Sequence, residues 1–308
     1  MTIDAATVQV ATSAEARGGG GGARRAARSH RRRGPLASLG LHAALIAASV
    51  IAVFPVFWVL VTSFKPDARA VEPTPKLVNQ SSLDNYVDVL NGSKGAFLSW
   101  FGNSVTIAAM TTVLGLFLAA TTGYAVSRFN FPGRRGLMLG FLVIQMFPFA
   151  VLIVPLYNIL LALGLQGSSI GLVLVYCTTA VPFCTYMLKG YFDTIPREID
   201  EAGRVDGLSP FGVFWRLVLP LARPGLAVTA FYAFLTAWGE VAFASAFLSA
   251  ADESKTLAVG LQVFVQQNRT EWGHLAAASI LVAVPAVVVF YLVQRFLVAG
   301  LAAGSVKG

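Results

Sequence analysis

The chain has 308 residues, of which 56% are hydrophobic and 12% are charged, and its mean hydropathy is +0.69. Soluble domains typically carry about 25% charged residues, so this chain has too little polar surface to cover a water-exposed globule. The composition excludes a disordered protein, a coiled coil and an ordinary soluble enzyme. It indicates a polytopic membrane protein.

Residues 1–35 form a low-complexity tail with seven arginines and a run of five glycines. We expect this tail to be disordered, because it has too few apolar residues to build a core. A basic cluster directly before an apolar run is typical of a topology signal or a contact with anionic lipid. We therefore expect membrane lipid, and no nucleic acid, as its partner.

Six apolar runs follow the tail, and each is longer than the ~20 residues that a helix needs to cross a bilayer. They cover residues 39–64, 100–127, 136–163, 168–191, 224–249 and 274–300. We predict an all-α polytopic membrane protein with six transmembrane helices in one domain, residues 36–308. A short helix is also predicted between the first two spans, at residues 82–90.

The distribution of Lys and Arg predicts the orientation of these spans. Seventeen of them lie in the N-terminal tail, the connections 128–135 and 189–223 and the C-terminal end, and six lie in the other connections. The positive-inside rule places both termini in the cytoplasm. Prolines within the third and fourth spans predict irregular helices, which either are kinked or line a path through the membrane.

The connection 192–223 is predicted to form a cytoplasmic helix-turn-helix. Pro196 suits the first turn of a helix, Gly207 is placed to end that helix in the left-handed conformation, and Ser209 with Pro210 starts a second helix. The first helix has a narrow face of small and apolar residues on an otherwise acidic surface. The face comprises Ile199, Ala202, Gly203 and Val205. A helix that lies on a membrane needs a larger apolar face and more Lys or Arg, so we favour docking to another protein.

This connection resembles the EAA loop of ABC-importer permeases. The pattern of that loop is Glu-Ala-Ala, three residues, Gly, nine residues, Ile, one residue and Leu-Pro. Here the spacing is intact, with Gly203 in place of the second Ala and Leu217 in place of Ile. In the family the loop is the coupling helix, which sits in a groove of the ATPase subunit. The resemblance implies a coupling role for Glu201, Ala202, Gly203, Asp206, Gly207, Leu219 and Pro220.

The resemblance extends over about residues 40–308 and is most similar to the MalG-type permease of maltose and maltodextrin transporters. Stretches that carry it are 145–148, 189–192, 240–241, 256–260, 272–273 and 303–308. It implies a type I ABC-importer (MetI-like) fold in the cell membrane and a role in sugar import. It also implies three partners: a second permease in a heterodimer, two copies of a cytoplasmic ABC ATPase and an extracytoplasmic sugar-binding protein. Maltose or maltodextrin is the expected sugar, with trehalose, cellobiose and other oligosaccharides as alternatives.

Two further sets of residues follow from this resemblance and from the charge pattern. In the family the C-terminal tail threads between the ATPase subunits, which implies contacts at Gly304, Val306, Lys307 and Gly308 on a short flexible tail. Glu240 is the one carboxylate inside a predicted span, and burial there costs about 2.5–3.5 kcal/mol. It either faces a path, serves as a structural hydrogen-bond acceptor to the partner permease, or lies near the membrane interface. The candidate path residues are Gln145, Pro148, Trp238 and Glu240.

No catalytic residue, metal ligand or cofactor is expected. The sequence has no G-x-x-x-x-G-K-[ST] loop, so ATP is expected to bind to the partner ATPase and the chain is not expected to be an enzyme. A secondary transporter or channel is the main alternative, but it predicts inverted repeats and several ionisable residues within the spans. A membrane-embedded enzyme requires a nucleophile with a base, or a metal site.

Overall fold

The computed structural model describes residues 35–65, 82–92, 96–248, 251–265 and 270–305. In these ranges the backbone is helical and forms no β-strand beyond two isolated bridges. The all-α prediction is therefore confirmed. The chain divides into two units, Met1–Pro55 and Val56–Gly308, which are described separately.

The first unit contains most of helix α2, which runs from Pro35 to Ser63. The unit ends at Pro55, inside this helix. Between Ser38 and Pro55 the apolar side chains are exposed on the isolated chain, including Leu45, Ile46, Val50 and Phe54. An exposed, uncharged helix of this length fits a surrounding of lipid or of another protein better than water. The predicted disordered tail lies outside the described residues.

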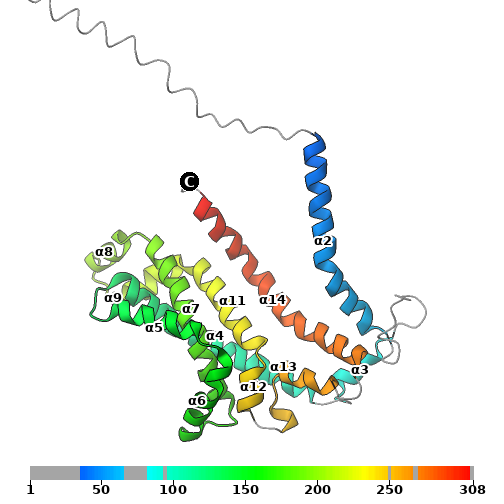
Figure 1. Ribbon diagram of the computed structural model, residues 1–308. Coiled ribbons are helices and arrows are strands. Elements are labelled where there is room, and N and C mark those ends of the chain that lie inside the picture. The colour runs from blue at the N-terminus through cyan, green and yellow to red at the C-terminus, as the bar shows by residue number, and fades with distance from the viewer. Residues whose placement is uncertain (1–34, 66–81, 93–95, 249–250, 266–269, 306–308) are drawn as a thin grey trace, which may run out of the picture. The chain divides into compact units, whose positions relative to one another are not determined.

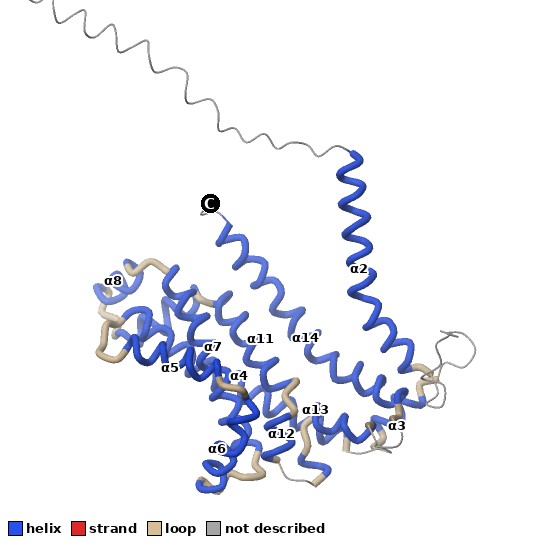
Figure 2. The backbone as a smooth tube through the Cα atoms, viewed as in Figure 1, coloured by secondary structure: helices blue, strands red, loops and turns tan. Residues whose placement is uncertain are grey.

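The second unit holds the remaining helices, shown in Figures 1 and 2. They are α3 (Asp84–Leu90), α4 (Phe97–Arg128), α5 (Arg134–Met146), α6 (Phe149–Ala162), α7 (Ser169–Thr194), α8 (Glu198–Val205), α9 (Pro210–Val213), the π-helix η3 (Phe214–Val218), α10 (Leu219–Leu221), α11 (Arg223–Trp238), α12 (Ala242–Phe247), the 3₁₀-helix η4 (Asp252–Ser254), α13 (Leu257–Gly260), the 3₁₀-helix η5 (Leu261–Phe264) and α14 (Trp272–Ser305). The short helix predicted at residues 82–90 is α3.

Helix α4 is the centre of the packing in this unit. It lies against α7 and α11, and α11 also contacts α14. Small residues permit the close approach of α4 to α7: a Cβ atom added to Gly123 would lie 3.2 Å from the backbone nitrogen of Lys189. Two apolar clusters result, one around Trp100 and Tyr176 and the other around Tyr124 and Phe192. The second cluster supports the connection that precedes α11.

In the described part of the chain, four helices are long and apolar enough to cross a membrane, and two bent helix pairs raise the number to as many as six. The four continuous spans are Ser38–Ser63, Phe97–Arg128, Ser169–Thr194 and Trp272–Phe296. The bent pairs are Arg134–Met146 with Phe149–Ala162, at 110°, and Pro210–Leu221 with Arg223–Trp238, at 84°.

Two of the predicted spans are broken helices. The span predicted at 136–163 is interrupted at Phe147 and Pro148, because the residue before a proline is driven into an extended conformation and Phe147 has ψ 133°. The span predicted at 224–249 stops at Trp238 and resumes as the short helix α12 from Ala242. A continuous apolar run predicts that a segment lies in the membrane, but it does not show where the helix within that segment is interrupted.

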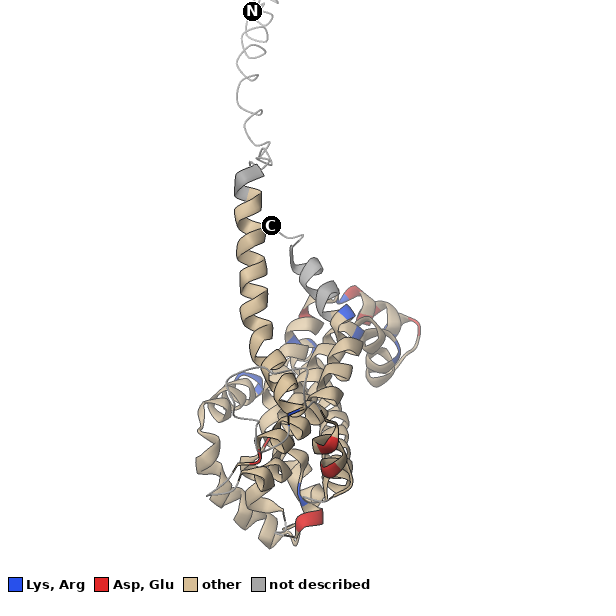
Figure 3. Ribbon diagram, turned by 90° about the vertical axis from the view of Figure 1, so that its right-hand side faces the viewer, with Lys and Arg blue, Asp and Glu red and all other residues tan. Residues whose placement is uncertain are grey.

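Charged residues of the second unit lie toward its two ends, and the long helices between them are almost uncharged (Figure 3). One charged end contains α8 and the last turns of α4 and α7. This distribution is typical of a membrane protein, in which charges avoid the apolar layer.

Candidate functional site

Helix α8 is a short acidic helix with a defined beginning and end. Three acidic residues lie in its first turn, where they favour the positive end of the helix dipole: Glu198, Asp200 and Glu201. Gly207 follows the helix with φ +84°, a left-handed conformation that side chains with a Cβ rarely adopt. The conformation predicted for Gly207 is thus confirmed, and it turns the chain away from α8.

The segment after this turn consists of three short helical pieces, α9, η3 and α10. The hydroxyl of Ser209 accepts a hydrogen bond from the backbone N–H of Gly212 at 3.1 Å, and Pro210 is the first residue of α9. This is the predicted helix start. A π-turn, η3, and the short helix α10 follow and bring the chain to Leu219 and Pro220, which precede α11.

Gly203 explains how α8 packs on this segment. A Cβ atom on Gly203 would lie 2.6 Å from Leu217 Cδ1 and 3.0 Å from Val213 Cγ2, so a side chain would displace these groups. Gly203 and Leu217 are the two positions at which the loop departs from the family pattern. The structure places them in contact, and Cδ1 of Leu217 occupies the space that a Cβ atom on residue 203 would need.

The outward surface of α8 differs from the predicted narrow face. Gly203 is buried and faces the protein, whereas Ala202 and Val205 are exposed, the latter to 87%. The interpretation that Gly203 offers room to a docking protein is therefore wrong: it offers room to Leu217. The exposed residues between positions 201 and 206 are Glu201, Ala202, Arg204, Val205 and Asp206.

Two exposed aromatic residues lie on the segment after the turn, on the face away from Val213 and Leu217, and the sequence analysis did not single them out. Phe211 and Trp215 are 62% and 54% exposed, and their rings stack with centroids 6.2 Å apart. Large apolar residues exposed together are typical of a contact with another protein or with lipid. The spacing of four residues on one helical face was the available signal.

The inner side of α8 is held by a buried carboxylate. Asp200 accepts a hydrogen bond from the hydroxyl of Tyr124 at 2.6 Å, and its other oxygen lies 3.1 Å from Arg128 Nε. The side chains of Arg128 and Asp200 are only 5% and 7% exposed. Arg128 is one of the cationic residues in the charge pattern and Asp200 lies in the acidic first turn of α8, and nothing local in the sequence connects them.

Glu240 lies in the break between α11 and α12. Its carboxylate accepts hydrogen bonds from the hydroxyl of Tyr176 at 2.7 Å and from the backbone N–H groups of Phe243 and Ala244 at 2.8 and 3.0 Å. It therefore caps α12 from inside the apolar region. This geometry is that of a structural hydrogen-bond acceptor whose donors lie in this chain rather than in a partner permease.

The other candidate path residues also have partners within the chain. Trp238 is buried, its Nε1 donates to the carbonyl of Val282 at 3.2 Å, and its ring stacks on Phe234. Gln145 Nε2 donates to the carbonyl of Thr179 at 2.9 Å, just before the break. Pro148 is the N-cap residue of α6 and directly precedes its first residue, Phe149. The structure brings Gln145 and Pro148 to one break, and Trp238 and Glu240 to another.

The C-terminal residues were predicted to form a flexible tail. Helix α14 instead continues to Ser305 and so includes Gly304, while Val306, Lys307 and Gly308 lie outside the described residues. Helix α14 continues this far because residues 296–303 are mostly Leu and Ala, which favour a helix and extend the preceding span.

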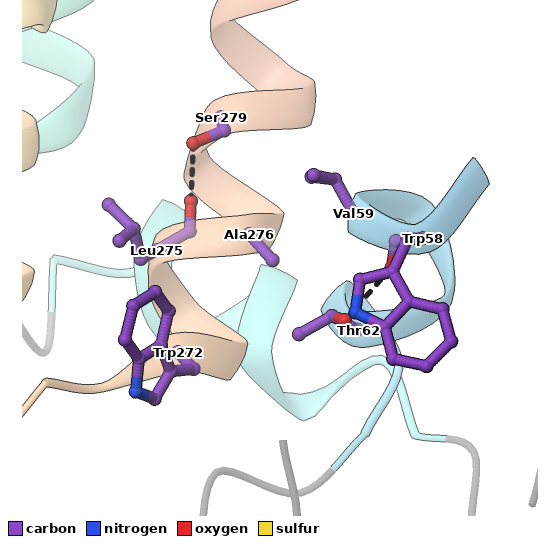
Figure 4. A pocket seen from close by; sticks show the side chains of 7 residues that line it. All are labelled: Trp58, Val59, Thr62, Trp272, Leu275, Ala276 and Ser279. Atoms are coloured by element: carbon purple, nitrogen blue, oxygen red, sulfur yellow. Dashed lines mark hydrogen bonds between the residues drawn. The ribbon is translucent and has the colours of Figure 1, made fainter. Parts of the chain in front are cut away.

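An apolar pocket of about 360 Å³ lies between the end of α2 and the start of α14 (Figure 4). The rings of Trp58 and Trp272 flank it, and its two hydroxyls are already used. Thr62 donates to the carbonyl of Trp58 and Ser279 donates to the carbonyl of Leu275. A pocket with so few polar groups in its lining does not match the hydroxyl-rich surface of a sugar.

In the described part of the chain, no group of three His, Cys, Asp or Glu side chains could hold a metal ion. The structure contains a set of apolar spans, two of which are broken helices. At one charged end it also contains the short helix α8, whose inner side is held by Asp200 and whose outer side is exposed. These features define the membrane-embedded subunit of a transport complex.

The chain belongs to the family of binding-protein-dependent transport system inner membrane components, whose family model matches residues 112–302. It is 38% identical over 274 residues to the inner membrane ABC transporter permease protein YcjP of Escherichia coli, covering 89% of this chain and 98% of that protein. It is also 38% identical over 213 residues to the maltodextrin transport system permease protein MdxG of Bacillus subtilis, covering 69% of this chain and 76% of that protein. The chain is therefore a multi-pass ABC-transporter permease rather than an enzyme.

The fold is that of a solved importer. A chain in the crystal structure of a bacterial ABC transporter involved in the import of the acidic polysaccharide alginate superimposes with a TM-score of 0.72 and 20% identity, covering 84% of this chain and 96% of that chain. The MetI-like importer-permease fold expected from the sequence is thus confirmed.

Proposed function

We propose that this chain forms half of the translocation path of an ATP-driven sugar importer and couples to a cytoplasmic ATPase through α8 to α10. One observation supports this most strongly. The side of α8 that carries Asp200 and Gly203 is fixed on the protein, while Glu201, Ala202 and Val205 face outward. A helix built in this way presents a rigid edge to a partner and transmits a displacement to the helices behind it.

The proposed substrate is an oligosaccharide, with maltose or maltodextrin as the first candidate. MdxG is named for maltodextrin transport, and the structurally similar chain comes from a transporter of alginate, which is also a glycan. These names support a carbohydrate as the substrate class. Trehalose and cellobiose remain alternatives for the particular sugar.

The proposed assembly contains a second permease subunit, two copies of an ABC ATPase and an extracytoplasmic binding protein, as the family description suggests for the last. ATP would bind to the ATPase, since this sequence contains no phosphate-binding loop. The distribution of Lys and Arg supports cytoplasmic termini, so that α8 would face the ATPase. We further assign the breaks at Pro148 and Glu240 to the path.

The C-terminal end is proposed as a second ATPase contact, at Gly304, Val306, Lys307 and Gly308. Deleting residues 306–308 should leave insertion and permease pairing intact and should weaken sugar-stimulated ATP hydrolysis. Hydrolysis and transport at the full-length rates would show that these three residues make no productive contact.

The proposed function is tested by measuring which sugar is bound by the binding protein that co-purifies with the complex. The reconstituted complex should then take up that radiolabelled sugar into proteoliposomes. Uptake that stops when ATP is removed but resists an uncoupler supports an ATP-driven importer. Uptake that an uncoupler abolishes while ATP is present would indicate a secondary transporter instead.

A further inference from the structure

Arg128 has a double attachment at the charged end of the second unit. It is the last residue of α4. Its Nε lies 3.1 Å from Asp200 Oδ2, and its Nη2 donates a hydrogen bond to the carbonyl of Ile195 at 2.9 Å. One side chain of a membrane-spanning helix thus holds both α8 and the residue that directly follows α7.

One side of this ion pair is apolar, while on the other side Arg128 borders an open pocket that Asp193 and Glu198 also line. The ring of Tyr124 lies 4.7 Å from that of Phe214 and 5.9 Å from that of Phe192, measured between centroids. Both phenylalanines are buried. The two side chains of the ion pair are only 5% and 7% exposed, so water screens the attraction between Arg128 and Asp200 poorly. Removing either partner would leave an unpaired buried charge.

Helix α8 has two kinds of attachment. Gly203 packs on Leu217 and Val213, which belong to the segment directly after α8. Asp200 instead connects α8 to α4, through Arg128 and through Tyr124, a residue 76 positions away in sequence. Apolar packing allows a helix to slide or rotate, whereas the carboxylate with partners on both oxygens fixes its orientation relative to α4.

We propose that Arg128 and Asp200, supported by Tyr124, are positioning residues that transmit movement between the coupling helix α8 and the spanning helix α4. This inference rests on the proposed function, because it requires that α8 meets the ATPase. When α8 is displaced by its partner, α4 follows, and with it α7 and α11, which pack on α4. The pair therefore connects ATP hydrolysis to the translocation path.

The test uses the complete transporter in proteoliposomes and compares ATP hydrolysis with and without the sugar-loaded binding protein. The wild-type complex is measured first; lack of stimulation there would contradict the proposed function and not the positioning role. For Asp200→Asn and Arg128→Gln we expect the ATPase to co-purify and the stimulation to fall by about tenfold or more, because a lone charge remains buried. Asp200→Glu keeps the carboxylate and should recover most of the stimulation.

A matched control is Lys255→Gln, which removes the partly exposed ion pair with Asp252 and should leave stimulation unchanged. A second variant separates transmission from folding. Arg128→Met with Asp200→Leu replaces the buried pair by apolar side chains, an exchange that commonly preserves stability. We expect this double variant to assemble and yet to remain poorly stimulated.

Several results would overturn the proposal. Wild-type stimulation in Asp200→Asn and Arg128→Gln would show that the pair is not needed for transmission. Full stimulation in the apolar double variant would show that the pair serves packing alone. Failure of the single variants and of the double variant to assemble would show that these residues act in folding rather than in coupling.

Discussion

Two carboxylates of the second unit receive a tyrosine hydroxyl in almost the same way, but they are completed differently. Asp200 accepts from Tyr124 at 2.6 Å and pairs with Arg128. Glu240 accepts from Tyr176 at 2.7 Å and otherwise from two backbone N–H groups of α12. In the part of the chain that the structure describes, no cationic side chain pairs with Glu240.

The difference indicates two uses for a carboxylate in this fold. Asp200 joins helices that are distant in sequence, α4 and α8, at the charged end of the unit. Glu240 satisfies the start of the helix that follows it, inside the apolar region where free N–H groups are costly. The first carboxylate determines how two elements are oriented relative to each other, and the second allows a span to be broken.

The largest effect is expected for Asp200→Ala. Loss of this carboxylate leaves Arg128 buried without an anion, at a cost of about 3–5 kcal/mol. The midpoint of thermal unfolding of the purified complex should fall further for Asp200→Ala than for Glu240→Ala. The reverse order would show that Glu240 contributes more to the stability of the complex than the pair of Asp200 and Arg128 does.

Glu240→Ala removes an acceptor from three donors, but Glu240 is only half-buried, so water can reach the freed groups and the total cost should be about 1–3 kcal/mol. We expect the ATPase to co-purify normally and sugar uptake to fall, because the break at α12 loses its cap. Glu240→Gln should be intermediate, since its amide retains one accepting oxygen. Unchanged uptake in Glu240→Ala would exclude Glu240 as a path residue and as an important cap.

Gly207→Val tests the coupling end without touching the ion pair. Space around Gly207 is open, so the effect comes from the left-handed backbone, at about 1–2 kcal/mol for a residue with a Cβ. We expect a membrane-inserted protein that fails to retain or stimulate the ATPase. Gly207→Asn is the control, because asparagine tolerates this conformation. Normal sugar uptake by Gly207→Val would remove the basis for assigning docking to α8.

Lys189→Gln should have the smallest effect. Lys189 pairs with Asp193 at 2.6 Å near the same end of the unit, but the two side chains are 26% and 42% exposed. Such pairs contribute about 0–1 kcal/mol, and Asp193 keeps its hydrogen bond from Ser127. Unfolding temperature and stimulation should stay close to wild type. If Lys189→Gln lowered the unfolding temperature and the stimulation as much as Asp200→Ala does, the difference in burial would not explain the different importance of the two ion pairs.

Local chemistry made part of this site predictable from the sequence. Gly207 and Ser209 act through their own backbone or their next few residues, so their roles could be read from spacing. The contact between Arg128 and Asp200 could not, because it depends on how α4, α7 and α8 pack. The break at Pro148 had a local signal in the proline, and the break at Glu240 had one in the lone carboxylate. The conformation of neither break followed from hydrophobicity.

The contact between Gly203 and Leu217 has a consequence for how this loop changes over evolutionary time. With 2.6 Å between a new Cβ and Leu217 Cδ1, alanine at position 203 requires the Leu217 side chain to shift or to be replaced by a smaller or differently branched one. Conversely, shortening Leu217 beside a glycine opens a void. Each position therefore restricts the substitutions accepted at the other, and the two should co-vary among homologous chains while the exposed edge of α8 varies with its partner.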